Sequence, residues 1–297
     1  MLITVFTPAY NRAHLLPRLY ESLMAQTFQD FEWIIVDDGS TDNTKDVVKE
    51  WLQPEGGGND FHPLDGIKGG IRYIKQPNGG KHRAVNRGAQ EARGELFFIA
   101  DSDDYLPDDS LERVAEKYEK IKDDNTIGGI CGLDVAPDGA CVSSKLTQDE
   151  IICNSIDIRL KYHVTGDLKE VFFTHVMREF PFPEFDGERF CPEALVWNRI
   201  AQKYNLLFFN EPIYIAEYQP EGITAGIVHA RVNSPVASVT HYQELNSYNT
   251  PLKEKVKAAI NYWRFRACVS KGKSVPKLPW HWFWCQPLGY LMHLKDK

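Results

Sequence analysis

Acidic residues follow an apolar, strand-like run in the first third of the chain. Asp101, Ser102, Asp103 and Asp104 come directly after Glu95–Ala100, which reads Glu-Leu-Phe-Phe-Ile-Ala. Hard divalent cations take oxygen ligands, and Mg²⁺ is often held by one or two carboxylates together with the phosphates of a substrate. The Asp101-Ser102-Asp103 sequence therefore predicts a partial site for Mg²⁺ or Mn²⁺, with Asp101 and Asp103 as the protein ligands. A helix cap is the weaker alternative, because Asp108 or Asp109 is expected to cap the helix that starts near Ser110.

Two further strand-like runs end in polar residues. The first is followed by Thr7-Pro-Ala-Tyr-Asn11, and the second ends in Val36-Asp-Asp-Gly-Ser40. A carboxylate at such a strand end can accept a hydrogen bond from a base imide or a ribose hydroxyl, and Pro8 and Tyr10 offer flat apolar surface for a nucleobase. Taken singly, each segment is equally compatible with an ordinary turn. Together with the Asp101-Ser102-Asp103 sequence, they predict a nucleotide site.

A glycine-rich segment precedes a helix-like stretch. Its sequence is Asn78-Gly-Gly-Lys-His-Arg83. Backbone N–H groups that glycine leaves accessible, and basic side chains at a helix N-terminus, can bind an anion. A turn followed by a solvated helix is about as compatible with this segment when it is judged alone.

The elements that position these residues alternate in type. Strand-like runs are Leu2–Phe6, Glu32–Val36, Ile71–Ile74 and Glu95–Ala100, and helix-period stripes include Leu15–Leu23, Val47–Leu52 and Leu111–Ile121. Such βαβ units predict an α/β fold with a mostly parallel sheet and helices on both faces, which binds ligands at the carboxyl ends of its strands.

The remainder is less regular. Gln53–Gly70 is rich in Gly, Pro and Asp, and is expected to form an exposed loop. After Cys131 the pattern predicts strands over Leu206–Phe209 and Pro212–Ile215, and a helix over Ala194–Tyr204.

Composition excludes several classes. The 297 residues, 43% of them hydrophobic, suffice for a large core, and a net charge of -7 argues against a nucleic-acid partner. The six cysteines show no Cys-x-x-Cys pair, which favours a reducing compartment. We find no signal-peptide or membrane-spanning pattern and expect a cytoplasmic protein.

The first 110 residues resemble the family-two glycosyltransferases with a GT-A fold. The resemblance rests on Thr7–Arg12, Ser22–Trp33, Val36–Asp42, Asn78–Lys81 with Ala84 and Asn86, and Ala100–Asp104. It implies an inverting enzyme that takes a sugar from a nucleotide diphosphate. It also implies nucleotide recognition by Pro8, Tyr10 and Asp38, and a metal and diphosphate held chiefly by Asp103, assisted by Asp101. The full set of donor-site residues is Thr7, Pro8, Tyr10, Asn11, Asp38, Asn78, Gly79, Lys81, Arg83, Asp101 and Ser102.

The family also carries a catalytic base within an acidic motif that opens a helix. The matching segment here is Gly187–Asn198, in which Pro192-Glu193 stands where the family usually has Glu-Asp. Glu193 is the candidate base and Glu188 a weaker substitute. The competing interpretation of Glu193 is a carboxylate in the first helical turn that stabilises the helix dipole.

These features predict a GT-A catalytic domain over residues 1–225, with a Rossmann-like nucleotide-sugar half at 1–110 and an acceptor half at 111–225. A helical, aromatic-rich extension follows at 226–297. The expected reaction moves a sugar, with a UDP-sugar favoured, to a hydroxyl of a glycan or lipid-linked acceptor in cell-surface polysaccharide synthesis. A non-catalytic sugar-nucleotide-binding module and a nucleotidyltransferase are the alternatives.

The C-terminal extension gathers aromatic residues and lysines. Leu278–Trp284 and Leu288–His293 lie beside Lys271, Lys273, Lys277, Lys295 and Lys297. This composition is typical of peripheral contact with the inner face of a membrane. A helix packed on the catalytic domain or on a partner subunit is equally compatible with it.

Overall fold

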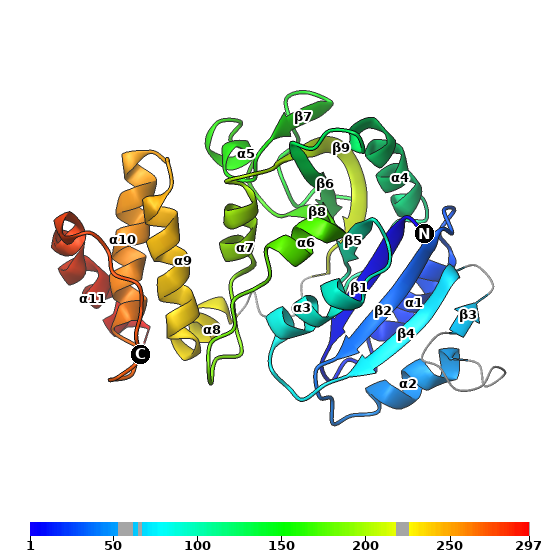
Figure 1. The fold of residues 1–297 in the computed structure, drawn as a ribbon, viewed down its shortest axis with the longest axis horizontal. Helices are drawn as coiled ribbons and strands as arrows, with labels where there is room; N and C mark the ends of the chain where they lie inside the picture. Colours follow the sequence, from blue (N-terminus) through cyan, green and yellow to red (C-terminus); the bar gives the residue numbers. More distant parts are fainter. Residues whose placement is uncertain (53–61, 65–66, 218–225, 297) are drawn as a thin grey trace. The chain divides into compact units, whose positions relative to one another are not determined.

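The computed structural model describes residues 1–52, 62–64, 67–217 and 226–296. The chain forms two compact units (Figure 1). The first unit comprises Met1–Asn78, Arg83–Pro181 and Arg199–Glu217. The second comprises Gly79–His82, Phe182–Asn198 and the described part of Tyr218–Lys297.

A single sheet forms the centre of the first unit. Its described strands follow the order β3-β4-β2-β1-β5-β8-β6-β9-β7. Strands β4, β2, β1 and β5 run parallel, and β6 and β9 are parallel to each other, whereas β3, β8 and β7 pair antiparallel with their neighbours. The strand bounds are β1 (Ile3–Ala9), β2 (Phe31–Asp37), β3 (His62–Leu64), β4 (Ile67–Lys75), β5 (Leu96–Ile99), β6 (Ile127–Val135), β7 (Glu150–Cys153), β8 (Leu168–Phe173) and β9 (Asn205–Ile215).

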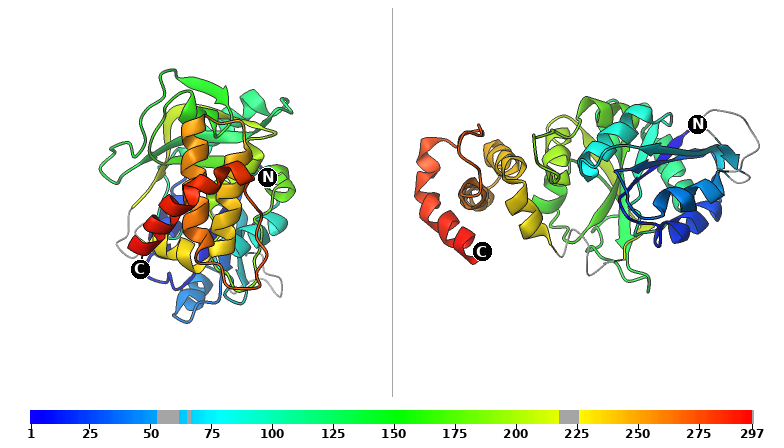
Figure 2. Two further views of the ribbon diagram at one scale, coloured as in Figure 1. Left: turned by 90° about the vertical axis from the view of Figure 1, so that its left-hand side faces the viewer. Right: turned by 90° about the horizontal axis from the view of Figure 1, so that it is seen from below.

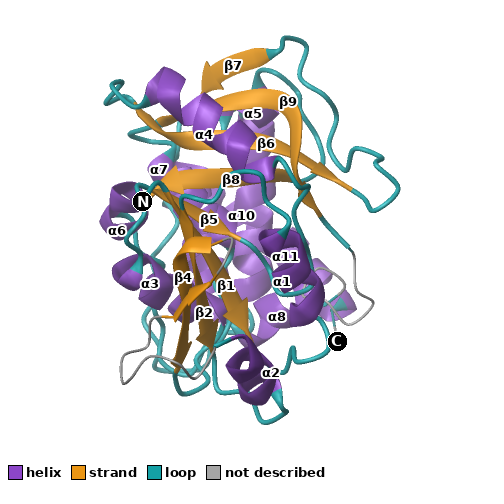
Figure 3. Ribbon diagram, turned by 90° about the vertical axis from the view of Figure 1, so that its right-hand side faces the viewer, coloured by secondary structure: helices purple, strands orange, loops and turns teal. Residues whose placement is uncertain are grey.

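Helices cover both faces of the parallel half of this sheet (Figure 3). On one face, the Trp33 ring of β2 lies against Trp51 of α2 (Thr44–Trp51), which stacks on Tyr20 of α1 (Leu16–Met24) at 4.4 Å between ring centroids. On the other face, Gly88 of α3 (Lys81–Glu91) passes so close to Phe6 of β1 that a Cβ would meet the ring at 2.2 Å. The βαβ pattern of the sequence is therefore confirmed as an α/β fold with a mostly parallel sheet.

Helix α4 (Ser110–Ile121) packs on β6 and β9 in the other, mixed half of the sheet. Its Ser110 hydroxyl donates to the carbonyl oxygen of Ile213 at 2.6 Å, and its Lys117 ammonium lies 4.9 Å from the ring centre of Phe209. The short helices α5 (Asp157–Leu160) and α6 (Thr174–Glu179) flank β8 in sequence. This half supports the strand ends at which the acidic residues lie.

Four local predictions were wrong. Of the expected Gln53–Gly70 loop, residues 53–61 and 65–66 lie outside the described residues, but 62–64 and 67–70 belong to the antiparallel pair of β3 and β4. Gly69 is needed there because a Cβ would lie 2.6 Å from the carbonyl oxygen of Phe31, so this glycine marks a close approach of strands. The two strands expected at Leu206–Phe209 and Pro212–Ile215 are one strand, β9.

The third error concerns the cap of α4. Asp109 occupies the N-cap position without a side-chain capping hydrogen bond, because its carboxylate pairs with Arg113 at 2.6 Å. The helix that opens at Glu193 ends at Ile200, earlier than the expected Tyr204.

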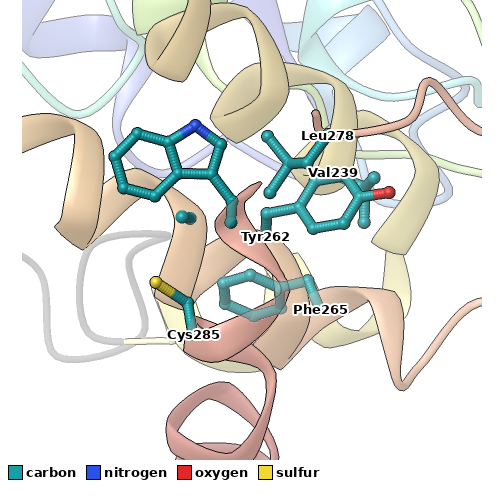
Figure 4. Packing of buried hydrophobic residues seen from close by; sticks show 7 residues of the cluster. Val239, Tyr262, Phe265, Leu278 and Cys285 are labelled. Atoms are coloured by element: carbon teal, nitrogen blue, oxygen red, sulfur yellow. The ribbon is translucent and has the colours of Figure 1, made fainter. Parts of the chain in front are cut away.

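The second unit is mainly helical. It contains most of α7 (Glu193–Ile200), then α8 (Ile227–Asn233), α9 (Pro235–Ser247), α10 (Leu252–Arg266), the 3-10 helix η1 (Trp280–Cys285) and α11 (Gln286–Lys295). Helices α9, α10 and α11 lie side by side (Figure 2). Their shared core is a cluster of buried side chains, most of them labelled in Figure 4: Val239, Ala259, Tyr262, Phe265, Leu278, Trp282 and Cys285. Among the described residues, none of the helices is both long enough and apolar enough to cross a lipid bilayer.

Candidate functional site

The end of β1 is held to the loop after β2 by Asn11. Its backbone adopts a φ of 54°, its amide N–H donates to the Ser40 hydroxyl at 2.9 Å, and its side-chain oxygen accepts from the Thr41 N–H at 2.8 Å. Thr7 is fully buried, and its hydroxyl accepts a hydrogen bond from the Trp33 indole at 2.9 Å. Asn11 thus holds the backbone of the loop after β2 and Thr7 links β1 to the Trp33 side chain, while Tyr10 is 45% exposed.

The two aspartates after β2 differ in their surroundings. Asp37 is fully buried; its carboxylate accepts hydrogen bonds from the Ser40 N–H, at 2.7 Å, and from the Tyr73 hydroxyl. Burial and the Asp37 carboxylate raise the pKa of Tyr73 well above its usual value. Asp38 accepts instead from the Gln76 side chain at 2.8 Å. Asp37 therefore stabilises the turn through the Ser40 N–H, whereas Asp38 contacts a side chain of the next strand region, and the sequence alone does not show this difference.

The acidic loop after β5 is tied down through its backbone. The Asp101 N–H donates to the Tyr214 hydroxyl at 2.7 Å, and the Asp104 N–H donates to the Asp101 carbonyl oxygen at 3.1 Å. Arg18 of α1 donates to the carbonyl oxygen of Asp103 and to the carboxylate of Glu217. For the Asp103 carboxylate itself, the described part of the chain offers no hydrogen bond or ion pair. The loop is thus fixed while this carboxylate remains available.

The third acidic residue of this loop, Asp104, is bonded to the backbone of Glu217. The carboxylate of Asp104 accepts from the Glu217 N–H at 2.8 Å. Burial, followed by the charge of Asp101, raises the pKa of Asp104 to about 7. Burial also raises the pKa of Asp134, at the end of β6, to about 7, although Lys169 opposes the shift. The charged forms of these two carboxyl groups are disfavoured in the structure as it stands. A cation bound nearby would stabilise the charged forms.

These surroundings fit a divalent cation held in part by protein. Asp101 and Asp103 supply hard oxygen ligands, and their loop is already positioned by Arg18 and Tyr214. Among the described residues there is no group of three or more His, Cys, Asp or Glu side chains arranged to hold a metal ion. A cation here would therefore need further oxygen ligands, which the phosphates of a nucleotide can supply.

The glycine-rich segment before α3 has a different explanation from the expected one. Gly80 has a φ of 98°, and a Cβ at this position would lie 2.0 Å from the carbonyl oxygen of Arg189. His82 is buried at 4% exposure, so it does not present a basic side chain to solvent. The glycine permits a close approach to the 182–198 segment, and the anion site stays a prediction to which the buried His82 does not contribute an exposed basic side chain.

Lys81 contacts the candidate base. Its ammonium lies 2.9 Å from a carboxylate oxygen of Glu193, the first residue of α7, and both residues belong to the second unit. Glu193 is partly exposed and is the first residue of its helix. This side chain can accept a proton from a bound hydroxyl.

Glu188 has a structural position instead. It is buried at 2% exposure, and its two carboxylate oxygens accept the N–H groups of Val236 and Ala237 at 2.8 and 2.9 Å. It caps the first turn of α9 and does not replace Glu193 as base.

Phe182 packs against Trp197 at 5.7 Å between ring centroids and is buried, so it belongs to the core.

The structure therefore distributes the expected site residues over both units. Thr7, Pro8, Tyr10, Asn11, Asp38, Asn78, Arg83, Asp101, Ser102 and Asp103 belong to the first unit, and Gly79, Lys81 and Glu193 belong to the second. Sequence reasoning missed Arg18, Tyr214 and Glu217. Arg18 contacts residues 85 and 199 positions away, and no local pattern reveals such pairs.

Comparisons with known proteins show similarity to glycosyltransferases. Residues 4–138 match the model of glycosyl transferase family 2. Glycosyltransferase GlyG of Streptococcus pneumoniae is 27% identical over 225 residues, which cover 72% of this chain and 70% of GlyG. Chondroitin synthase of Pasteurella multocida is 32% identical over 145 residues, covering 48% of this chain and only 13% of the synthase.

Solved structures share the fold. Residues 1–349 of S. aureus TarS in complex with UDP-GlcNAc superpose with a TM-score of 0.62 at 16% identity, covering 100% of this chain and 88% of that one. The mannosyltransferase PcManGT from Pyrobaculum calidifontis, in complex with GDP-Man and Mn²⁺, gives a TM-score of 0.57 at 17% identity, covering 99% and 87%.

Proposed function

Since residues 4–138 match the model of glycosyl transferase family 2 and the chain has a GT-A fold, we propose that the protein is a metal-dependent, inverting glycosyltransferase. In this proposal it transfers a sugar from a nucleotide diphosphate to an acceptor hydroxyl. The observation that carries the proposal is the acidic loop after β5, whose backbone is fixed by Arg18 and Tyr214 while the Asp103 carboxylate remains available.

The donor would bind at the carboxyl ends of β1, β2 and β5. Pro8 and Tyr10 offer flat surface to the nucleobase, and Asp38 accepts a hydrogen bond from the base or the ribose. Asp103, with Asp101, would hold Mg²⁺ or Mn²⁺ against the diphosphate. A bound cation would offset the negative charge that grows on the departing nucleotide diphosphate. Asn78, Gly79, Lys81, Arg83 and Ser102 are proposed to line the rest of the donor site.

Glu193 is proposed as the general base. Its carboxylate would take the proton of the acceptor hydroxyl as the oxygen attacks the anomeric carbon from the side opposite the diphosphate. No covalent intermediate with the protein is required, and the anomeric configuration inverts. The Lys81 ammonium, 2.9 Å away, would hold this carboxylate in position.

The relatives support a choice of donor. TarS has been solved with UDP and with UDP-GlcNAc, and PcManGT with GDP-Man and Mn²⁺. The chondroitin synthase of Pasteurella multocida is a polysaccharide-forming relative by name. We therefore propose a UDP-sugar donor and an acceptor that is a glycan or a lipid-linked glycan, used in cell-surface polysaccharide synthesis.

A donor screen tests this proposal. The full chain is incubated with UDP-GlcNAc, UDP-glucose or GDP-mannose, with Mn²⁺ or with EDTA, and release of nucleoside diphosphate is measured. We expect slow release of UDP from one UDP-sugar. This release should require Mn²⁺, and it should become faster when the acceptor is added. Release of pyrophosphate from UTP instead would indicate a nucleotidyltransferase, and donor binding without any turnover would indicate a binding module.

A further inference from the structure

The segment from Trp280 to Leu294 directs most of its large apolar side chains to solvent. Elsewhere among the described residues, exposed large apolar side chains occur only at scattered positions, for example Ile152 and Leu252. A contiguous group of this kind marks an interaction surface rather than ordinary surface variation. We call it the C-terminal apolar surface: Trp280, Phe283, Trp284, Leu288, Tyr290, Leu291, Met292 and Leu294, with exposed fractions from 37% to 81%.

This exposure does not come from a detached helix. Helix α11 is fixed along a narrow edge, where Gly289 lies so close to α10 that a Cβ would be 2.5 Å from the carbonyl oxygen of Ile260. Next to this edge, Arg264 of α10 donates two hydrogen bonds to the Asp296 carboxylate, at 2.5 and 2.6 Å. Trp282 and Cys285 of η1 enter the buried cluster shown in Figure 4. The remaining sides of η1 and α11 are therefore held outward.

The charge of the surrounding sequence is opposite to that of the whole chain. From Lys255 to Lys295 there is no Asp or Glu, whereas the whole chain has a net charge of -7. The basic residues of this stretch are Lys255, Lys257, Arg264, Arg266, Lys271, Lys273, Lys277 and Lys295. Two of them pair with acids directly outside the stretch, Lys257 with Glu254 and Arg264 with Asp296. Two copies joined through this surface would bring like charges together, so the charge disfavours a second copy and favours an anionic partner.

We propose that the C-terminal apolar surface binds peripherally to a membrane that contains anionic lipids. Trp and Tyr side chains are enriched at the level of lipid headgroups, and flanking lysines attract anionic lipids. A helix with exposed Leu, Met and aromatic side chains can bury them at the boundary between headgroups and acyl chains. This inference goes beyond the proposed function and does not depend on it.

Vesicle flotation tests the proposal without any sugar donor. The full chain is mixed with vesicles of phosphatidylcholine, with or without phosphatidylglycerol, and the bound fraction is measured. A variant carrying Trp280→Ser, Trp284→Ser and Leu291→Ser is compared with a control carrying Ile152→Ser and Leu252→Ser, which alters equally exposed apolar residues elsewhere. Since all five side chains are exposed, thermal unfolding is expected to stay unchanged and shows whether each variant folds.

We expect the wild-type chain and the control to float with vesicles that contain phosphatidylglycerol, and the surface variant to lose at least roughly tenfold in affinity. Replacing Lys271, Lys277 and Lys295 with Gln should weaken binding by roughly fivefold per lysine at low salt. Equal flotation of the wild type and the surface variant overturns the proposal. A second result also overturns the proposal: the wild type does not float, it forms a dimer in analytical ultracentrifugation, and the surface variant does not form this dimer. The surface would then bind a second copy of the chain.

Discussion

The acidic loop after β5 and the C-terminal apolar surface use exposed side chains in opposite ways. The loop is half-buried at its polar residues Asp101, Asp103 and Asp104, and its backbone is fixed by contacts from α1 and β9. The C-terminal surface exposes many apolar groups on helices held mainly by a narrow edge and a small core. The difference indicates that a metal or catalytic site needs residues from distant parts of the chain to position it. Binding to a membrane needs exposed apolar area and positive charge. The predictions below test whether the two regions are separable in this way.

Asp103→Asn is expected to have the largest effect on catalysis. The amide keeps the shape of the side chain but removes a charged oxygen ligand, and loss of several kcal/mol of charge stabilisation lowers turnover on the order of a thousandfold. The measurement is nucleoside diphosphate release with Mn²⁺. Asp109→Asn, at the N-cap position of the nearby helix α4, is the matched control and should retain full activity. Vesicle binding should not change in either variant, and full turnover by Asp103→Asn would refute the metal assignment.

Glu193→Gln is expected to reduce sugar transfer by roughly a hundredfold or more. Glutamine can still accept a hydrogen bond from Lys81 but cannot take a proton, so donor affinity should stay nearly constant. Turnover with acceptor and donor binding by calorimetry are measured on the same preparation. Glu184→Gln, an exposed acid in the preceding loop, serves as the control. Equal loss of donor binding and turnover would show that Glu193 holds the donor instead.

Arg18→Met should have a smaller effect, roughly a tenfold loss in kcat/KM. It removes the donors to the Asp103 carbonyl oxygen and to Glu217, so the loop loses its position although its carboxylates remain. The concentration of Mn²⁺ needed for half-maximal activity should rise, which a loss of overall stability would not produce. Arg87→Met, which breaks an exposed pair on α3, is the control. An unchanged Mn²⁺ dependence would contradict this positioning role.

Asp134→Asn is expected to change stability rather than catalysis. Burial raises the pKa of Asp134 from 3.8 to about 7, so between these pH values the folded state holds a proton that the unfolded state releases. The stability of the wild type should therefore fall as pH rises through this window. Asparagine does not ionise, and should raise Tm by about 2–4 °C at pH 8 but not at pH 4, measured in EDTA. The control Asp123→Asn, at an exposed position, should not change Tm at either pH. A gain in Tm that Asp134→Asn shows equally at pH 4 and pH 8 would exclude a link between Asp134 ionisation and stability.

The parts of the fold that sequence reasoning predicted are those with local signals. Apolar runs and helical stripes identified β1, β2, β5 and α1, and placed Asp101 and Asp103 at a strand end. The order of the sheet, in which β8 lies between β5 and β6, required pairing between Leu96–Phe98 and Val171–Phe173. Such pairings depend on chain segments far apart, which periodicity does not report.

The sequence by itself determined the α/β class, the acidic loop after β5 and the concentration of aromatic and basic residues near the C-terminus, because each arises from neighbouring residues. Only the tertiary structure decided which acid does what: Asp37 and Glu188 are committed to backbone N–H groups, whereas Glu193 pairs with Lys81. It also decided that Gly80 permits a close backbone approach and that the C-terminal aromatic residues face outward. The physical reason is that a side chain's partners and exposure are set by packing between distant segments, and residue type alone leaves both open.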